Sequence, residues 1–237
     1  MKCAIVDERI SRDCERALLI DGFTLIKTPP SKRLSAPVSS HPDMLMFYHR
    51  GNIISSADYC EDAPYVFSDI RELTENVRFT FTSDVFERDY PRDAIFNALI
   101  ARDRIFIKAD TASEAICDYA RSAGLKIVPI KQGYPACTVL AFGNSAITAD
   151  AGMAAAMKIV GITVTLISNG DISLPPYEYG FIGGASGVFK NTVYFLGNPL
   201  LHRDSGKITA AITDAGFDIC ALSDEPLTDL GRIIFIE

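Results

Sequence analysis

The sequence predicts an α/β protein, a five-bladed α/β propeller of ββαβ units with pseudo-fivefold symmetry. Four helical patterns each end at a small or apolar residue plus glycine, the usual C-cap, and lead directly into a β-branched or aromatic strand. These junctions are Asp21-Gly22, Ala123-Gly124, Val160-Gly161 and Ala215-Gly216. Short turns join two strands ahead of the later helices, and the chain ends in a lone strand. A repeat of this kind predicts a ring of similar units.

The first two units show the repeat with its exceptions. The first has no leading strand: it reads as a strand at 3–6, a helix at 11–21 and a strand at 23–27. The second has strands at 44–48 and 53–56 around the turn 50–52, and a strand at 77–82. Its helix is irregular because Pro64 interrupts it.

The last three units are more regular. The third is predicted to have strands at 94–100 and 104–108, a helix at 113–123 that starts from a Thr111/Glu114 capping box, and a strand at 125–130. In the fourth, strands at 137–142 and 145–148 precede a helix at 151–160, capped by Asp150, and a strand at 162–167. The fifth has strands at 186–189 and 192–196, a helix at 205–215 and a strand at 217–222.

The C-terminal strand, predicted at 232–236, is the piece that the first unit lacks. Pairing it with the N-terminal unit would close the ring and remove exposed sheet edges. The 237 residues then form a single domain whose units are approximately 1–40 plus 227–237, 41–89, 90–133, 134–178 and 179–226. An ordinary α/β sheet with alternating strands and helices is the alternative.

Composition excludes several classes of protein. The net charge is −7 and no Lys/Arg cluster occurs, which argues against a nucleic-acid partner. No window approaches 18 uninterrupted apolar residues, and Asp7, Glu8 and Arg9 lie in the first ten residues, so we expect neither a membrane span nor a signal peptide. The six cysteines show no CxxC spacing. We therefore expect a cytoplasmic protein with reduced thiols and neither a metal nor a cofactor.

Polar residues open several of the predicted units. The second opens with His41-Pro42-Asp43, the third with Tyr90-Pro91-Arg92-Asp93 and the fourth with Tyr134-Pro135-Ala136-Cys137. Five ββαβ units with such openings resemble the pentein superfamily, the guanidine-modifying enzymes that include arginine deiminases, dimethylarginine dimethylaminohydrolases, amidinotransferases and agmatine deiminases. In those enzymes the opening segments place polar side chains in a central channel. The resemblance implies that Asp43, Asp93 and Cys137 face one pocket.

The resemblance also implies a chemistry, in which a Cys attacks a guanidinium carbon, a His moves protons and carboxylates hold the cation. The family's nucleophile comes from the last strand segment, but residues 227–234 contain no Cys. Cys137 stands where the family has a His-x-Asp segment. We therefore take Cys137 as the candidate nucleophile, with His41 and Asp43 as the proton-handling pair. The alternative for Cys137 is packing at the start of a strand.

The remaining candidates concern binding. Asp93 is the expected cation anchor, Asn97 a polar lining residue, and the other substrate-binding candidates are Tyr134, Gly183, Gly184 and Ser186. The glycines would let the backbone approach a ligand, although a bulged strand start explains them equally well. Lys131 is near enough in sequence to lower the pKa of Cys137. His49 is expected to be solvated and His202 to lie in a capping loop.

These observations predict a guanidino or amidino hydrolase or transferase that acts on a small arginine-like cation. The alternative is a non-catalytic pentein binding module, similar in kind to the ribosome anti-association factor. The sequence leaves a homodimer open.

Overall fold

The computed structural model describes residues 2–236. Over this range the strands form five three-stranded sheets and one two-stranded sheet, none of which closes on itself. In each three-stranded sheet the middle strand pairs antiparallel with one neighbour and parallel with the other. A helix connects each parallel pair because parallel strands need a crossover. This is the predicted ββαβ arrangement of strands.

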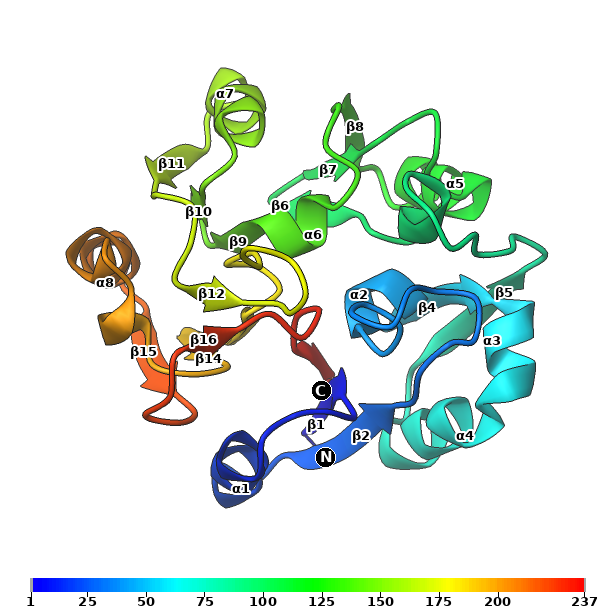
Figure 1. Ribbon diagram of the computed structural model, residues 1–237. Helices are drawn as coiled ribbons and strands as arrows, with labels where there is room; N and C mark the ends of the chain where they lie inside the picture. The colour runs from blue at the N-terminus through cyan, green and yellow to red at the C-terminus, as the bar shows by residue number, and fades with distance from the viewer. Residues whose placement is uncertain (1, 237) are drawn as a thin grey trace.

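The first sheet joins the two ends of the chain. It contains β1 (Cys3–Asp7), β2 (Thr24–Thr28) and β17 (Ile234–Ile236), with α1 (Arg12–Ile20) as the crossover. β17 pairs antiparallel with β1, so that Cys3 lies opposite Ile236 and Ile5 opposite Ile234. The N and C labels accordingly lie close together in Figure 1.

The next two sheets follow in chain order. The second contains β3 (Met46–His49), β4 (Asn52–Ser56) and β5 (Arg78–Thr82), preceded by α2 (Pro42–Leu45) and crossed over by α3 (Ala57–Asp62) and α4 (Pro64–Leu73). The third contains β6 (Leu99–Ala101), β7 (Arg104–Ile107) and β8 (Lys126–Pro129), with the short η1 (Arg92–Ala94) and α5 (Glu114–Ser122). The break between α3 and α4 falls at Pro64, as predicted.

The remaining sheets complete the molecule. The fourth contains β9 (Val139–Phe142), β10 (Ser145–Thr148) and β11 (Thr163–Leu166), with α6 (Pro135–Thr138) and α7 (Ala151–Ile159). The fifth contains β13 (Ser186–Phe189), β14 (Thr192–Phe195) and β15 (Asp218–Ala221), with η2 (Pro199–Leu201) and α8 (Ser205–Asp214). The two-stranded sheet pairs β12 (Ile172–Ser173) with β16 (Leu227–Thr228).

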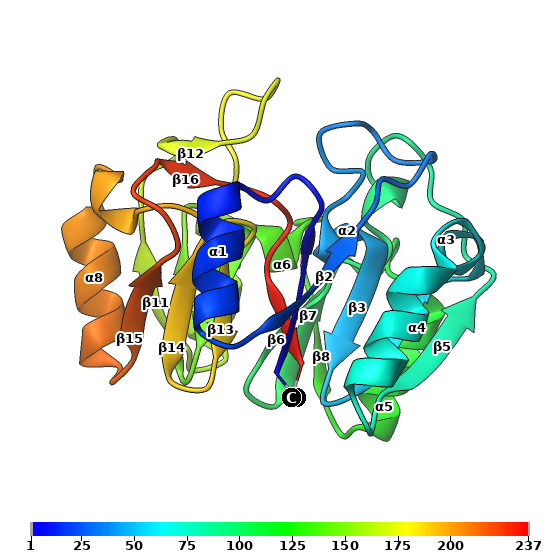
Figure 2. The same cartoon turned by 90° about the horizontal axis from the view of Figure 1, so that it is seen from below.

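The five three-stranded sheets lie around a common centre (Figure 1). The crossover helices α1, α4, α5, α7 and α8 lie on the outside, whereas the short helices α2 and α6 lie near the centre. Viewed from the side, β12 and β16 lie at one end of the molecule, beyond the ends of the longer strands (Figure 2). Residues of α2 and α6 are therefore well placed to meet.

Aromatic packing joins the C-terminal strand to its neighbours. Phe235 of β17 packs against Phe23 with a ring-centroid distance of 4.8 Å and against Tyr194 of β14 at 5.1 Å. These residues belong to one buried apolar cluster that includes Leu18 of α1. The first and fifth sheets are therefore held together through residues from both ends of the chain.

The starts of three predicted strands are wrong. Residues 42–45 and 135–138 form the short helices α2 and α6, and the third unit has η1 in place of the start of its first strand. Pro42 and Pro135 stand in the first turn of their helices, where a fixed φ suits the helix and the missing N–H costs nothing. The polar opening residues therefore sit on helical turns.

The two predicted caps have different outcomes. The Asp150 cap is confirmed, because its carboxylate accepts the Met153 N–H at 2.8 Å. The Thr111/Glu114 capping box is wrong, because Ser113 is the N-cap residue of α5 and the Thr111 hydroxyl donates to Asp110. All helices within residues 2–236 are at most ten residues long, too short to cross a bilayer.

Candidate functional site

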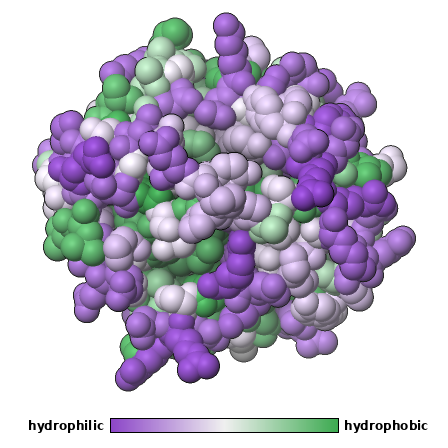
Figure 3. Space-filling model, viewed as in Figure 1, coloured by the Kyte–Doolittle hydropathy of each residue, from purple (hydrophilic) through white to green (hydrophobic). Residues whose placement is uncertain are grey.

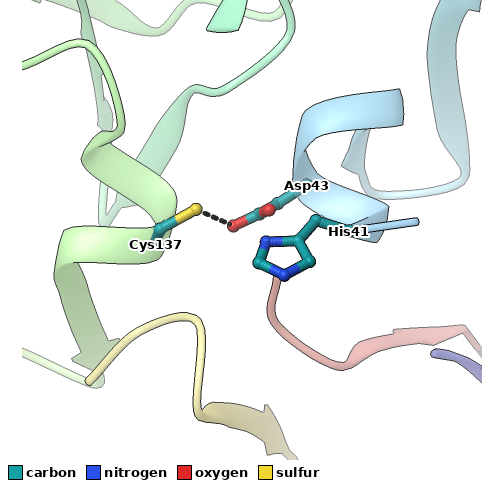
Figure 4. A group of neighbouring side chains, drawn as sticks. All are labelled: His41, Asp43 and Cys137. Atoms are coloured by element: carbon teal, nitrogen blue, oxygen red, sulfur yellow. Dashed lines mark hydrogen bonds between the residues drawn. The ribbon is translucent and has the colours of Figure 1, made fainter. Parts of the chain in front are cut away.

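Two short helices bring the candidate catalytic residues together. The Cys137 thiol of α6 donates a hydrogen bond to Asp43 Oδ2 of α2 at 2.9 Å (Figure 4). Side-chain donor atoms of His41, Asp43 and Cys137 all lie within 4.8 Å of one another, and all three residues are buried. Residues almost a hundred positions apart thus share one centre, as the convergence of equivalent openings predicts.

Asn97 connects the two helices behind this cluster. Its Nδ2 donates to the Cys137 sulfur at 3.2 Å and to the Asp43 carbonyl oxygen at 3.3 Å. Its Oδ1 accepts the Ala136 N–H at 2.8 Å. The predicted lining residue is therefore a buried link that holds the Cys137 sulfur and the backbones of α2 and α6.

His41 is the N-cap residue of α2 and is completely buried. Neither ring nitrogen has a hydrogen-bond partner within residues 2–236. Nδ1 lies 3.9 Å from Asp229 Oδ1, and Nε2 lies 3.9 Å from Asp7 Oδ2. Burial, aided by the positive charge of Arg9, lowers the pKa of His41 to about 3. The imidazole is therefore neutral at physiological pH and has nitrogens free to exchange a proton.

Asp229 is a site residue that the sequence analysis did not select. It follows β16, and its carboxylate accepts the N–H groups of Phe181 at 2.8 Å and Gly231 at 3.1 Å. Burial, followed by the negative charge of Asp43, raises the pKa of Asp229 to about 7. Its only signal in the sequence is its place in the C-terminal segment, where the resemblance implies a Cys.

Burial also raises the pKa values of the Cys137 thiol and of its hydrogen-bond partner Asp43. It raises the pKa of Asp43 to about 6, against the opposing effects of the Cys137 hydrogen bond and the Arg232 charge. It raises the pKa of the Cys137 thiol well above its ordinary value, and the charges of Asp43 and Asp229 act in the same direction. The predicted lowering by Lys131 is wrong, since Lys131 is exposed and lines a different cavity. The thiol is protonated at neutral pH.

A cavity of about 400 Å³ gives access to this cluster. The polar side chains that line it are His41, Asp93, Tyr134, Cys137, Glu178 and Asp229. Its apolar and aromatic wall consists of Val38, Met44, Leu174, Tyr177, Tyr179 and Phe181. Figure 3, in the view of Figure 1, shows apolar and neutral atoms recessed among hydrophilic ones near the centre of the face.

A second cavity, of about 240 Å³, is lined by Asp43 and by the half-buried Arg232. The prediction that Asp43, Asp93 and Cys137 face one pocket is therefore wrong for Asp43, because Asp93 and Cys137 line the first cavity and Asp43 lines the second. The hydrogen bond between Cys137 and Asp43 joins a residue of one cavity to a residue of the other. Asp43 Oδ1 is buried without a hydrogen-bond partner among the described residues.

Asp93 and Tyr134 form a second polar pair in the first cavity. The Tyr134 hydroxyl donates to Asp93 Oδ2 at 2.7 Å, while Asp93 Oδ1 is buried and has no partner in residues 2–236. Burial raises the pKa of Asp93. A free carboxylate oxygen in an apolar wall suits a cationic hydrogen-bond donor.

The glycine-rich segment serves the protein's own packing. A Cβ at Gly184 would overlap the carboxylate of Asp229, and one at Gly183 would overlap the carbonyl oxygen of Ala136. Ser186 is buried and donates to the Ile182 carbonyl at 2.8 Å. None of these three predicted binding residues is among those that line the cavity.

The other two histidines do not line the cavity that contains Cys137, although His49 lines the second cavity. His49 differs from the predicted solvated residue, because its Nδ1 lies 2.8 Å from the Tyr119 hydroxyl and burial lowers its pKa to about 4. His202 lies in the loop before α8, as predicted, where its Nδ1 accepts the Asp204 N–H at 3.0 Å.

The cluster can act chemically in two ways. A thiol beside a neutral imidazole and carboxylates suits nucleophilic attack with proton transfer. The nitrogen, oxygen and sulfur donors of His41, Asp43 and Cys137 are also a set that could hold a divalent transition metal. A search for CxxC spacing cannot find this set, because it contains one cysteine and because Cys137 lies in a different unit from His41 and Asp43.

A family model described as a family of unknown function, DUF6873, matches residues 5–234. The chain belongs to the DUF6873 family. No curated protein sequence matches this DUF6873 protein significantly.

Solved structures with a similar fold include dimethylarginine dimethylaminohydrolase from Pseudomonas aeruginosa, determined in complex with citrulline. It has 12% identity and a TM-score of 0.57, over 94% of this chain and 91% of that one. An amidinotransferase of saxitoxin biosynthesis from Microseira wollei has 10% identity and a TM-score of 0.55, over 93% and 88%. An agmatine deiminase from C. jejuni has 8% identity and a TM-score of 0.52, over 93% and 75%. The DUF6873 protein therefore has the pentein fold, which confirms the predicted resemblance.

Proposed function

We propose that this DUF6873 protein is a cysteine-dependent pentein enzyme that hydrolyses or transfers the guanidino or amidino group of a small cation. The observation that carries the proposal is the Cys137 thiol in a cavity that also presents His41 and the carboxylates of Asp93, Asp229 and Glu178. Among the described residues that line this cavity there is no Lys or Arg. Such a lining favours a positively charged ligand.

The proposal treats residues 1–237 as one domain, a five-bladed propeller that closes through β1 and β17. The antiparallel pairing of these two strands supports closure, and the arrangement of five similar sheets around a centre supports the propeller. We also propose a cytoplasmic location, because all six cysteines of the sequence are free. Nothing in the proposal requires a homodimer.

A bound cation would activate the thiol. A unit positive charge about 4 Å from the sulfur contributes about 4 kcal/mol at an effective dielectric constant of 20. That energy corresponds to about three pKa units, and it would act against the effect of burial on the pKa of Cys137. The same charge would stabilise the ionised form of Asp229, whose pKa burial raises to about 7. Ligand binding and thiolate formation would therefore be coupled.

The reaction begins when the Cys137 sulfur bonds to the guanidinium carbon, a C–N bond breaks and the thiol proton leaves with the departing amine. Water then attacks the S-alkylthiouronium cation, and His41 takes one of its protons. The C–S bond breaks, His41 returns the proton to sulfur, and the second water proton converts the departed amine to an ammonium ion. An amine in place of water yields a new guanidinium ion and the same thiol.

The second candidate function is a non-catalytic binding module. The protonated thiol favours it, since Asp43 holds the Cys137 proton and the neighbouring charges oppose ionisation. In that case the cavity would bind a cation without breaking a bond.

The two functions are distinguished by incubating the protein with guanidino compounds and measuring ureido product, released amine and intact mass. We expect turnover, and an adduct on Cys137 at short times, with both lost in Cys137→Ser. The matched control is Cys117→Ser, which removes a half-buried thiol of α5 outside the cavity. Binding without product or adduct in the unmodified protein would leave the binding module.

A further inference from the structure

We infer that the ligand of this cavity carries two positive ends joined by an apolar spacer and has no carboxylate. This inference names the substrate class of the site and rests on the proposed function. It selects an amine-bearing guanidine over an amino acid such as arginine.

Over residues 2–236, the lining of the cavity offers no partner for a ligand carboxylate. An amino-acid ligand needs a cation or free N–H donors for its carboxylate. Within the described residues the cavity lining contains three carboxylic acids, the buried imidazole of His41 and no Lys or Arg. The Phe181 N–H on its wall is already donated to Asp229. A ligand carboxylate would therefore face repulsion without a compensating partner.

Three basic side chains, those of Arg9, Arg232 and Lys131, bind other groups or line other cavities. The Arg9 guanidinium donates to both Asp7 carboxylate oxygens and to the carbonyl oxygens of Ala36 and Pro37. Arg232 lines the second cavity, and Lys131 lines a third. Neither belongs to the lining of the cavity that holds Cys137.

The three acids that line the cavity differ in their exposure to solvent. Asp229 is 1% exposed and Asp93 is 4% exposed, so both lie in the interior with Cys137. Glu178 is exposed and belongs to the segment between β12 and β13. A guanidinium among the buried carboxylates would put its carbon near the thiol, while an ammonium at the other end would reach Glu178 at the entrance.

The wall between these depths is apolar and aromatic. Tyr179 and Phe181 pack edge to face with a ring-centroid distance of 6.4 Å, and Leu174, Met44 and Val38 also line the cavity. Such a wall suits a methylene spacer, and aromatic faces also attract cations. Polar groups on the spacer would find fewer partners there.

Binding to Cys137→Ser, measured by calorimetry at pH 8, tests the inference with three probes. Agmatine has a guanidinium and an ammonium, L-arginine adds a carboxylate, and n-butylguanidine has the guanidinium alone. We expect agmatine to bind more than about tenfold tighter than arginine. We expect Glu178→Gln to weaken agmatine about three- to fivefold, the range of an exposed charge pair, and to leave n-butylguanidine unchanged.

Glu225→Gln is the matched control, because Glu225 is exposed and lines another cavity. Equal or tighter binding of arginine would overturn the inference, as would loss of n-butylguanidine affinity in Glu178→Gln. Failure of all three probes to bind would overturn it too. Turnover by the unmodified protein is measured separately. Selective binding of agmatine without turnover would support the inferred ligand class and refute catalysis. Turnover with a preference for arginine would support catalysis and refute the inferred ligand class.

Discussion

Replacing Asp43 by Asn should make the protein more stable at alkaline pH than the unmodified protein. Asp43 is buried, and its pKa rises from 3.8 to about 6 on folding. The unfolded chain therefore loses its Asp43 proton at a lower pH than the folded protein does. Stability associated with this carboxyl is fully present below pH 3.8 and declines as the pH rises through about 6.

The size of the effect follows from the two pKa values. Each pKa unit corresponds to 1.36 kcal/mol, so the move from 3.8 to about 6 costs about 3 kcal/mol above pH 6. Most of this loss develops between about pH 4 and pH 6. Asn has nearly the same shape, and its side-chain oxygen can still accept the Cys137 hydrogen bond. It carries no charge to be desolvated, so the variant should not show this loss.

Urea denaturation followed by circular dichroism at pH 4, 6 and 8 measures the effect. The free energy of unfolding of Asp43→Asn relative to the unmodified protein should increase by about 2 kcal/mol from pH 4 to pH 8. Asp103→Asn is the control, because Asp103 is exposed and Lys126 lowers its pKa, so this variant should show no gain at pH 8. A stability difference for Asp43→Asn that does not change with pH would refute the electrostatic reasoning.

Three further predictions follow from the packing and from the proposed chemistry. Gly184→Ala should lower the free energy of unfolding by about 1–3 kcal/mol, because the added Cβ would overlap Asp229. Gly206→Ala in α8 should not destabilise the protein, because a Cβ added there would meet no described atom within 4 Å. Urea denaturation of both variants measures the difference. Deletion of residues 232–237 should destabilise the sheet that contains β1, and fast hydrogen exchange in β1 would show it, whereas unchanged protection would contradict the role of β17. EDTA should leave turnover unchanged if Cys137 acts as a free thiol, and loss of activity restored by Zn²⁺ would point to the metal-binding alternative.

Much of the architecture could be predicted because it depends on local signals. Glycine after four of the five crossover helices and the two-strand pattern before the later helices located the units, and the lone C-terminal strand indicated its pairing with the first unit. The same repeat predicted that Asp43 and Cys137 would converge, since equivalent positions in similar units face the same centre. The helical turns of α2 and α6 were missed, because a proline can open a strand as readily as a helix.

The candidate site was harder to predict because its properties arise from contacts between distant segments. Asp229 looks like any loop aspartate until the chain folds and brings it beside His41 and Asp43. Gly183 and Gly184 look like a ligand-binding loop, yet their missing side chains make room for Asp229 and α6. No pattern along the chain distinguishes these possibilities.

The ββαβ units, the free C-terminal strand and the residue types available for chemistry can be read from the amino-acid sequence. Which of those residues meet, and in which protonation state, depends on the folded chain. The physical reason is that burial and neighbouring charge set the pKa values of Cys137, His41 and Asp229, and both depend on segments far apart in the chain. The net charge of −7 alone does not indicate a ligand, whereas three acids that line one cavity favour a cation.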